Sequence, residues 1–110
     1  MAEIDGRTLD RLYAVIESRR GGDPAASYTA QLLAAGTPRI ARKLGEEALE
    51  AVIEALSGDG PRLAAESADL LYHLLVLWAD RGVTPGEVWR ALDERAGTSG
   101  IAEKRARGGG

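Results

Sequence analysis

Four carboxylates at a repeated spacing are the residues of this sequence best suited to chemistry. They form two pairs, Glu47 with Glu50 and Glu66 with Asp69, and the two members of each pair are three residues apart. On a helix this spacing places both side chains of a pair on one face, where like charges repel. Hard divalent cations prefer carboxylate oxygens as ligands. The four residues are therefore candidate ligands for Mg²⁺, with Mn²⁺ as an alternative.

The surroundings of the two pairs favour this interpretation. The first pair lies at the edge of an apolar stripe within residues 40–55, and the second lies in the mostly apolar segment 63–79, which is expected to be largely buried. Carboxylates beside buried surface are costly unless a cation or a basic partner compensates them. A salt-bridge network with Lys43, Arg42 or Arg62 is the alternative explanation. Zinc is disfavoured because the chain has no cysteine and a single histidine, and calcium because rigid helices supply no loop carbonyls.

The segments that carry these residues are predicted to be helices. Alanine and leucine dominate the apolar residues, and β-branched residues form no alternating run. Prolines and capping residues indicate where helices begin, and glycines indicate where they end. Thr37 is predicted to cap the second helix, and Thr84 with Glu87 to form a capping box on the fourth. The four main helices are predicted at residues 8–19, 37–56, 61–81 and 84–96.

The remaining segments are predicted as connections. Residues 23–36 are predicted as a loop in which residues 30–35 could form a helical turn, and residues 97–100 are predicted as a turn. A short helix is predicted over residues 101–107, followed by a disordered glycine tail at 108–110. Only about four residues join the second and third helices, so these helices should lie antiparallel with the two acidic pairs facing each other.

The predicted architecture is an all-α antiparallel helical bundle forming one domain over residues 1–107. Aromatic residues make up only 5% of the 110-residue chain, so the core must consist of leucine, isoleucine, valine and alanine. A chain this short buries limited surface by itself. We therefore expect dimerisation to complete the bundle.

Composition excludes several functional classes. The 14 basic and 17 acidic residues give a net charge of −3, which argues against nucleic acid as a partner. The absence of cysteine excludes disulfide scaffolds and thiol nucleophiles. The longest apolar run, residues 74–79, is too short to span a membrane, and charged residues interrupt the N-terminal segment where a secretory signal would lie. A cytoplasmic protein is expected.

The residues around the acidic pairs resemble a known family. Residues 43–50, Lys-Leu-Gly-Glu-Glu-Ala-Leu-Glu, and residues 66–73, Glu-Ser-Ala-Asp-Leu-Leu-Tyr-His, resemble the paired motif of the all-α nucleoside triphosphate pyrophosphohydrolases, the MazG-like group. Within that group, residues 27–29, residues 39–43 and the segment Ser-Gly-Ile-Ala-Glu-Lys at 99–104 are similar to phosphoribosyl-ATP pyrophosphatases. The resemblance extends from about residue 8 to residue 107.

The resemblance implies a specific activity. It implies Mg²⁺-dependent hydrolysis of phosphoribosyl-ATP to phosphoribosyl-AMP and pyrophosphate, the second step of histidine biosynthesis, in a homodimer or a dimer of dimers. The chain length leaves no room for the cyclohydrolase domain that is fused to this activity in some organisms, so a monofunctional form is expected.

Each candidate residue then has an expected role. The resemblance implies Glu47, Glu50, Glu66 and Asp69 as the Mg²⁺ ligands. Glu46 is the candidate general base, although its position on the helix favours an ion pair with Arg39 or Arg42. Lys43 is expected either to contact a substrate phosphate or to offset the acidic charge. The remaining candidates are Arg39, Ser99 and Lys104 for substrate binding, His73 either as a hydrogen-bond partner of a ligand carboxylate or as a satisfied core residue, and Tyr28 as a residue that closes over the site.

Two other functions are compatible with parts of the sequence. A house-cleaning hydrolase of free nucleoside triphosphates would share the four acids but not the segment at residues 99–104. A non-catalytic helical dimerisation module would leave the acidic pairs unexplained. Pyrophosphate release, measured with and without Mg²⁺, separates these alternatives.

Overall fold

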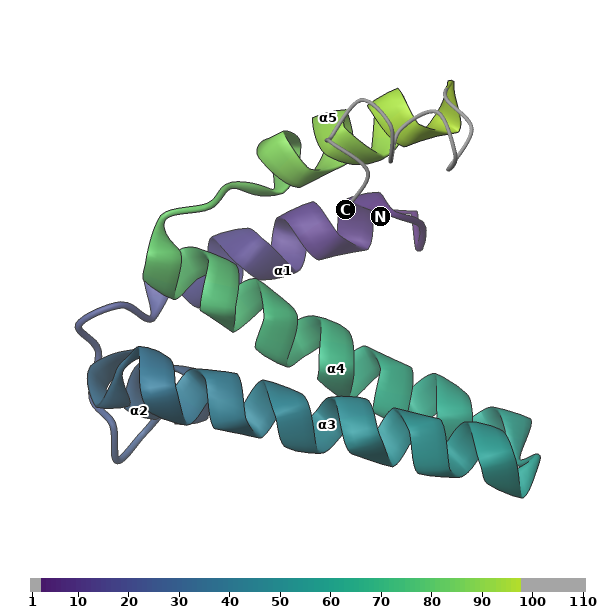
Figure 1. Ribbon diagram of the computed structural model, residues 1–110. Helices are drawn as coiled ribbons and strands as arrows, with labels where there is room; N and C mark the ends of the chain where they lie inside the picture. Colours follow the sequence, from purple (N-terminus) through teal and green to yellow (C-terminus); the bar gives the residue numbers. More distant parts are fainter. Residues whose placement is uncertain (1–2, 98–110) are drawn as a thin grey trace.

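The computed structural model describes residues 3–97, and within this range it contains five helices and no strand. The predicted all-α fold is confirmed, and the four main helices occur close to their predicted positions (Figure 1). None of the helices in the described range is long and apolar enough to cross a membrane. The helices are α1 (Arg7–Ser18), α2 (Tyr28–Ala35), α3 (Thr37–Ser57), α4 (Gly60–Arg81) and α5 (Pro85–Ala96).

The two longest helices, α3 and α4, lie antiparallel and side by side, and they share the most extensive helix–helix contact (Figure 1). Their connection is short because each end is strongly specified. Gly58 ends α3 in the left-handed conformation at φ 80°, which glycine adopts without steric cost. The Asp59 side chain then caps α4 by accepting a hydrogen bond from the backbone N–H of Arg62 at 3.0 Å. This hairpin places the two acidic pairs on neighbouring helices.

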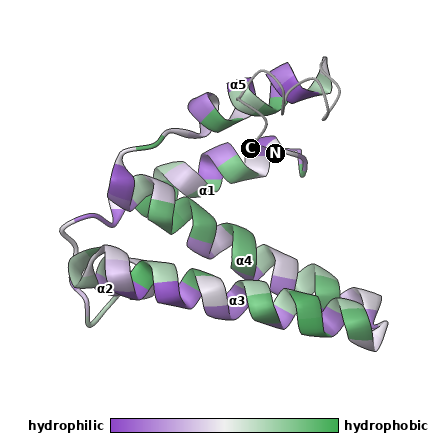
Figure 2. Ribbon diagram, in the orientation of Figure 1, coloured by the Kyte–Doolittle hydropathy of each residue, from purple (hydrophilic) through white to green (hydrophobic). Residues whose placement is uncertain are grey.

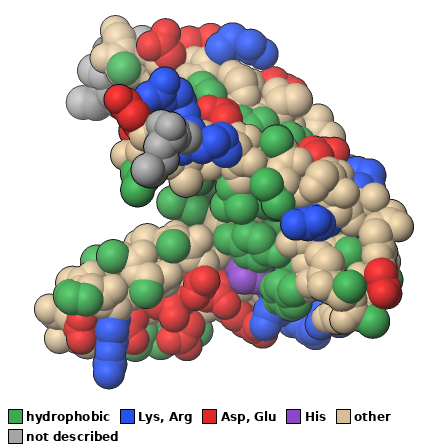
Figure 3. Space-filling model, turned by 180° about the vertical axis from the view of Figure 1, so that it is seen from behind, with side chains coloured by type: hydrophobic (Ala, Val, Ile, Leu, Met, Phe, Trp, Pro, Cys, Tyr) green, Lys and Arg blue, Asp and Glu red, His purple; other side chains and the backbone are tan. Residues whose placement is uncertain are grey.

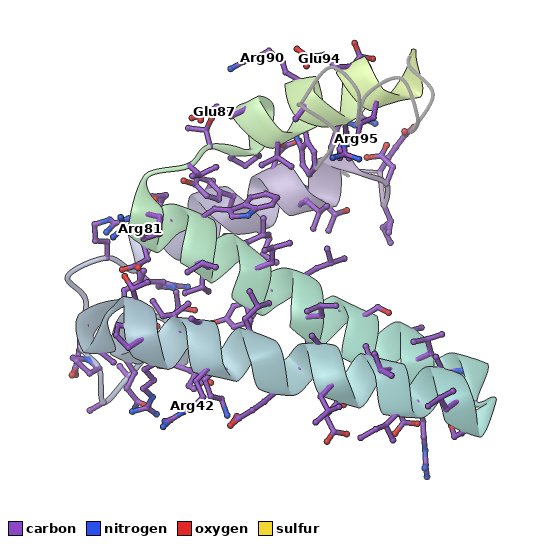
Figure 4. The ribbon with its side chains drawn as sticks, viewed as in Figure 1. Arg42, Arg81, Glu87, Arg90, Glu94 and Arg95 are labelled. Atoms are coloured by element: carbon purple, nitrogen blue, oxygen red, sulfur yellow. The ribbon has the colours of Figure 1, made fainter. Side chains whose placement is uncertain are left out.

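A second arm of the molecule consists of α1 and α5, with α1 packed against α4 (Figure 1). The Tyr13 hydroxyl of α1 donates a hydrogen bond to the Val83 carbonyl at 2.9 Å, which ties α1 to the end of α4. The indole rings of Trp78 and Trp89 meet edge to face with centroids 6.0 Å apart. Charged residues on the outer side of α5, such as Arg90, point away from α1 (Figure 4). The space-filling view shows that an open notch separates the two arms (Figure 3).

The core lies where the two arms meet. Its buried residues come from α1, α2, α3 and the C-terminal half of α4. The segment 63–79 was predicted to be largely buried, and this is wrong for its first half, because Leu71 is exposed and no residue before position 73 of α4 is buried. Hydrophobic residues also continue along the outer half of α3, away from this core (Figure 2). The buried core residues are Ile16, Leu32, Ile40, Leu75, Val76 and Ala79.

Helix α2 is the main correction to the predicted elements, because its residues were assigned to a loop in which only residues 30–35 could form a helical turn. Ser27 caps it by accepting a hydrogen bond from the Ala30 backbone N–H at 3.1 Å, and Leu32 is completely buried. Leu32 packs against residues from distant helices. The helix is therefore stabilised mainly by tertiary burial, which the local sequence does not reveal.

The start of α3 also differs from the prediction. Gly36, at φ 93°, precedes the helix, and Thr37 is its first residue rather than its cap. The Thr37 hydroxyl instead donates to Asp80 Oδ2 at 2.5 Å and joins the beginning of α3 to the end of α4. The capping box of Thr84 and Glu87 at the start of α5 is confirmed.

Candidate metal centre

Three of the four predicted ligand residues come together between α3 and α4. One carboxylate oxygen each from Glu47, Glu66 and Asp69 lies within 4.8 Å of the others. Glu66 and Asp69 are one turn apart on α4, and the antiparallel packing brings Glu47 of α3 beside them. Glu47 and Glu66 are partly buried and Asp69 is exposed, so the cluster is open to solvent on the Asp69 side.

The negative charges of this cluster repel one another. Oxygen Oε2 of Glu66 is buried and has no hydrogen-bond partner. The neighbouring Glu47 carboxylate has no proton to donate when it is ionised. If Glu66 is protonated, it can share its proton with Glu47 in a hydrogen bond, and this hydrogen bond is the main reason that the pKa of Glu66 lies above its ordinary value of 4.5. Desolvation, and then the negative charges of Glu47, Asp69 and Glu50, raise this pKa further.

These features fit a hard divalent cation. Mg²⁺ binds oxygen at about 2.0–2.1 Å in an octahedron, so opposite ligand oxygens are about 4 Å apart. The spacing of the cluster, with its limit of 4.8 Å, is close to this requirement. A cation would also supply the buried Glu66 oxygen with the partner that it lacks and remove the repulsion among the three acids.

Glu50, the fourth predicted ligand, lies outside this close cluster. It is one turn after Glu47 on α3 and is exposed. Its negative charge nevertheless contributes to the raised pKa of Glu66, so it lies within electrostatic range of the cluster. Glu50 therefore adds negative charge next to the three acids without being one of the close cluster.

Glu46 forms an ion pair, but not with the predicted partners. Its Oε1 lies 3.2 Å from Nζ of Lys43, one turn earlier on α3. The expected pairing with Arg39 or Arg42 is thus corrected, and Figure 4 shows Arg42 pointing away from α4. The Lys43 ammonium lies between the basic start of α3 and its acidic middle, where it offsets part of the negative charge.

His73 is buried one turn after Asp69, and both of its ring nitrogens have partners. Its Nδ1 lies 2.8 Å from the Asp69 carbonyl oxygen. A carbonyl can only accept, so Nδ1 is the donor. Of the two predicted roles, that of a satisfied core residue is the one observed, and the contact with a ligand carboxylate is replaced by a contact with the backbone of Asp69. The other nitrogen, Nε2, lies 3.4 Å from the Tyr28 hydroxyl.

An aromatic cluster beside His73 was not predicted. Tyr28 and Tyr72 stack with ring centroids 6.4 Å apart, and His73 meets both rings edge to face. The Tyr72 hydroxyl is hydrogen-bonded to Thr29, and burial raises the pKa of Tyr72, so its phenol stays neutral. The motif at residues 27–29 was noted in the sequence, but its contact with α4 depends on the position of α2.

The other predicted substrate residues are not part of this cluster. Arg39 is exposed near the start of α3, whereas Ser99 and Lys104 lie outside the described residues, as do the predicted helix at 101–107 and the glycine tail.

Comparison with known proteins identifies the family of this chain. The sequence profile of the phosphoribosyl-ATP pyrophosphohydrolase family matches residues 9–96, a range that includes all four candidate metal ligands. A phosphoribosyl-ATP pyrophosphatase of Azospirillum brasilense is 61% identical over 109 residues, covering 97% of this chain and 98% of that protein. A protein of the same name from Paramagnetospirillum magneticum is 58% identical and covers 94% of each chain. The chain therefore belongs to the phosphoribosyl-ATP pyrophosphohydrolase family of enzymes, within the MazG-like all-α superfamily.

Proposed function

We propose that this protein hydrolyses phosphoribosyl-ATP to phosphoribosyl-AMP and pyrophosphate with Mg²⁺ as its cofactor, the second step of histidine biosynthesis. The observation that carries the proposal is the cluster of Glu47, Glu66 and Asp69 around a buried oxygen without a partner. Support for the substrate comes from the family and from the names of relatives that align along almost the whole chain.

The acidic residues then have defined roles. Glu47, Glu66 and Asp69, with Glu50 beside them, would hold the cation. When bound, Mg²⁺ supplies charge neutralisation for the polyphosphate and lowers the pKa of a coordinated water. Glu46 remains the candidate general base, and releasing its ion pair with Lys43 would free the carboxylate to accept a proton and the ammonium to contact a phosphate.

The positions around the acidic cluster complete the proposed site. His73 would hold the Asp69 turn of α4 in place through its hydrogen bond to the backbone. Arg39, Ser99 and Lys104 are proposed to bind the phosphoribosyl end of the substrate.

Pyrophosphate release from phosphoribosyl-ATP, with and without Mg²⁺, tests the proposal. We expect turnover only with the metal, and we expect Asp69→Asn and Glu50→Gln to abolish it while helical circular dichroism is retained. Glu94→Gln, which makes the same chemical change on the outer side of α5, is the matched control and should keep full activity (Figure 4). Absence of turnover, or turnover without Mg²⁺, would overturn the proposal. Preference for ordinary triphosphates would favour the house-cleaning activity.

We also propose that the protein functions as a homodimer. Four large apolar residues on the outer half of α3 are exposed, with Leu56 83% and Leu49 60% accessible. Their spacing places them on one helix face, as is typical of a helix that packs against another. An exposed stripe of this kind is costly in water, and a second copy of the chain offers an identical stripe to cover it. The stripe consists of Leu49, Val52, Ile53 and Leu56.

Light scattering coupled to gel filtration tests this assembly. We expect the wild-type protein to elute as a dimer or a larger even assembly, and Leu56→Glu to shift it toward the monomer. Leu92→Glu introduces the same charge at an exposed leucine of α5 and is the matched control. A monomeric wild-type protein would refute the proposed dimer.

A further inference from the structure

An exposed aromatic ring that is not among the buried core residues lies close to the candidate metal centre. Tyr28 is the first residue of α2, and 43% of its surface is accessible. Large aromatic side chains are usually more buried than this, because their rings contribute strongly to packing. The buried residues of α2 are Ala30 and Leu32, so the burial that anchors this helix in the core comes from side chains other than Tyr28.

The Tyr28 ring is held in a defined orientation despite its exposure. It stacks on Tyr72 at an interplanar angle of 24°, with ring centroids 6.4 Å apart. Its hydroxyl is 3.4 Å from Nε2 of His73. Tyr72 is itself held by its hydrogen bond to Thr29. One side of the Tyr28 ring is thus supported by protein while the ring remains accessible to solvent.

The supported ring is close to the acidic cluster. His73 contacts Tyr28 through one ring nitrogen and the Asp69 backbone, at 2.8 Å, through the other. A single side chain therefore links the aromatic pair to a candidate metal ligand. The view from behind shows the same order on the surface, with the histidine between acidic side chains and hydrophobic ones (Figure 3).

The acidic cluster and the aromatic ring follow one another along the surface as the phosphates and the base do in a nucleotide. The phosphates carry negative charge and belong at a cation, whereas the base is a flat aromatic ring that the sugar keeps away from the phosphates. If the phosphates of a nucleotide were held at the acidic cluster, its base would need a flat apolar contact near the cluster but outside it. Aromatic side chains provide such contacts by stacking, which every base can use.

We propose that Tyr28 is the stacking platform for the purine base of the nucleotide bound at the metal centre, with Tyr72 supporting it from behind. This assignment rests on the proposed function for the position of the phosphates. It extends that function because it assigns recognition of the base to α2, a helix that carries none of the metal ligands.

Two substitutions at Tyr28 separate stacking from its hydroxyl contact. Tyr28→Leu keeps apolar volume but removes the aromatic face, and Tyr28→Phe keeps the face but removes the hydroxyl. The binding probes are α,β-methylene-ATP, which has a base, and inorganic tripolyphosphate, which has none, each titrated calorimetrically with Mg²⁺. Loss of one base–aromatic stack should weaken binding of the nucleotide analogue about 5- to 150-fold.

We expect Tyr28→Leu to weaken binding of the analogue by this factor and to leave tripolyphosphate binding unchanged, while Tyr28→Phe binds both probes like the wild-type protein. Steady-state assays of Tyr28→Leu should show KM raised by a similar factor, with little change in kcat. The proposal is overturned if Tyr28→Leu binds the analogue normally, if both probes lose affinity equally, or if Tyr28→Phe is as weak as Tyr28→Leu.

The binding experiment does not require turnover, which keeps this test independent of the proposed reaction. Tyr28-dependent binding without pyrophosphate release would support the platform and refute the proposed function. Normal Mg²⁺-dependent turnover with an unchanged KM in Tyr28→Leu would support the proposed function and refute the platform.

Discussion

Replacing Glu66 by glutamine should remove most of the stabilisation that Mg²⁺ gives to this protein. In the metal-free protein Glu66 is held beside Glu47 and Asp69, and its buried oxygen has no partner. A glutamine amide is uncharged and can donate a hydrogen bond to Glu47. Metal-free Glu66→Gln should therefore melt at the same temperature as the wild-type protein or above it, whereas the wild-type protein should gain far more from Mg²⁺.

The size of the metal effect follows from binding linkage. A ligand that binds only the folded state at one hundred times its Kd stabilises it by about 2.7 kcal/mol. The described range, residues 3–97, corresponds to an unfolding entropy of about 0.2 kcal/mol/K, so each kcal/mol shifts Tm by about 5 °C. Wild-type Tm should thus rise by about 13 °C. A variant that binds one hundred times more weakly should gain only about 2 °C at the same free Mg²⁺.

Thermal melts followed by circular dichroism measure this difference. The wild-type protein and Glu66→Gln are compared after chelation of divalent cations. They are then compared at the same free Mg²⁺ concentration, which is set to one hundred times the wild-type Kd measured by calorimetry. Protein concentration is held constant, because dimerisation would also change Tm. Glu94→Gln controls for the loss of one negative charge and should respond to Mg²⁺ like the wild-type protein.

Two results would refute this reasoning. An unchanged wild-type Tm in Mg²⁺ would show that the acidic cluster does not bind the ion in the folded state. Equal Mg²⁺ shifts in the wild-type protein and Glu66→Gln would show that the ion binds elsewhere, and the metal centre would then have to be reassigned.

Further predictions concern pH and the contacts that hold the arms together. Without divalent cations, the free energy of unfolding should fall as pH rises from below 4.5 through the raised pKa of Glu66, because the folded protein holds that proton more tightly than the unfolded chain. Urea titrations at a series of pH values should show that this decrease in the free energy of unfolding is missing in Glu66→Gln. Tyr13→Phe removes the hydrogen bond to Val83 and should lower the free energy of unfolding by about 0.5–1.5 kcal/mol without changing Mg²⁺ affinity. An unchanged free energy of unfolding in urea denaturation would mean that the bond is not maintained in solution. Thr84→Ala breaks the capping box with Glu87 and should cost about 0.5–2 kcal/mol in the same measurement, with an unchanged midpoint counting against a role for the cap.

The main helices could be predicted because their ends are specified by local chemistry. Gly82 adopts a left-handed conformation at φ 74° after α4, and Thr84 caps the next helix. These signals act within a few residues and need no tertiary context. Helix α2 was predicted only as a possible helical turn within a loop, because its stability comes from burying Leu32 against other helices, and no residue near it in the sequence indicates that burial.

Three of the acids that meet in the candidate metal centre were likewise predictable from spacing. Acids three residues apart must share a helix face, and a short turn between α3 and α4 must bring two such faces together. Side-chain pairing was less predictable, because several basic residues lie within reach of one acid on a helix. Glu46 pairs with Lys43 rather than with Arg39 or Arg42, and backbone periodicity cannot choose among them.

The sequence by itself determined the four main helices, the four acids and the family, because these depend on residue type and on separations of a few positions. Tertiary structure decided which acids meet and what surrounds them. The hairpin selects Glu47, Glu66 and Asp69 as the close cluster and leaves Glu50 at its edge. Packing of α2 brings Tyr28 to a histidine 45 positions away. A contact across that separation depends on how the helices dock, which is set by the burial of many side chains together rather than by any local pattern.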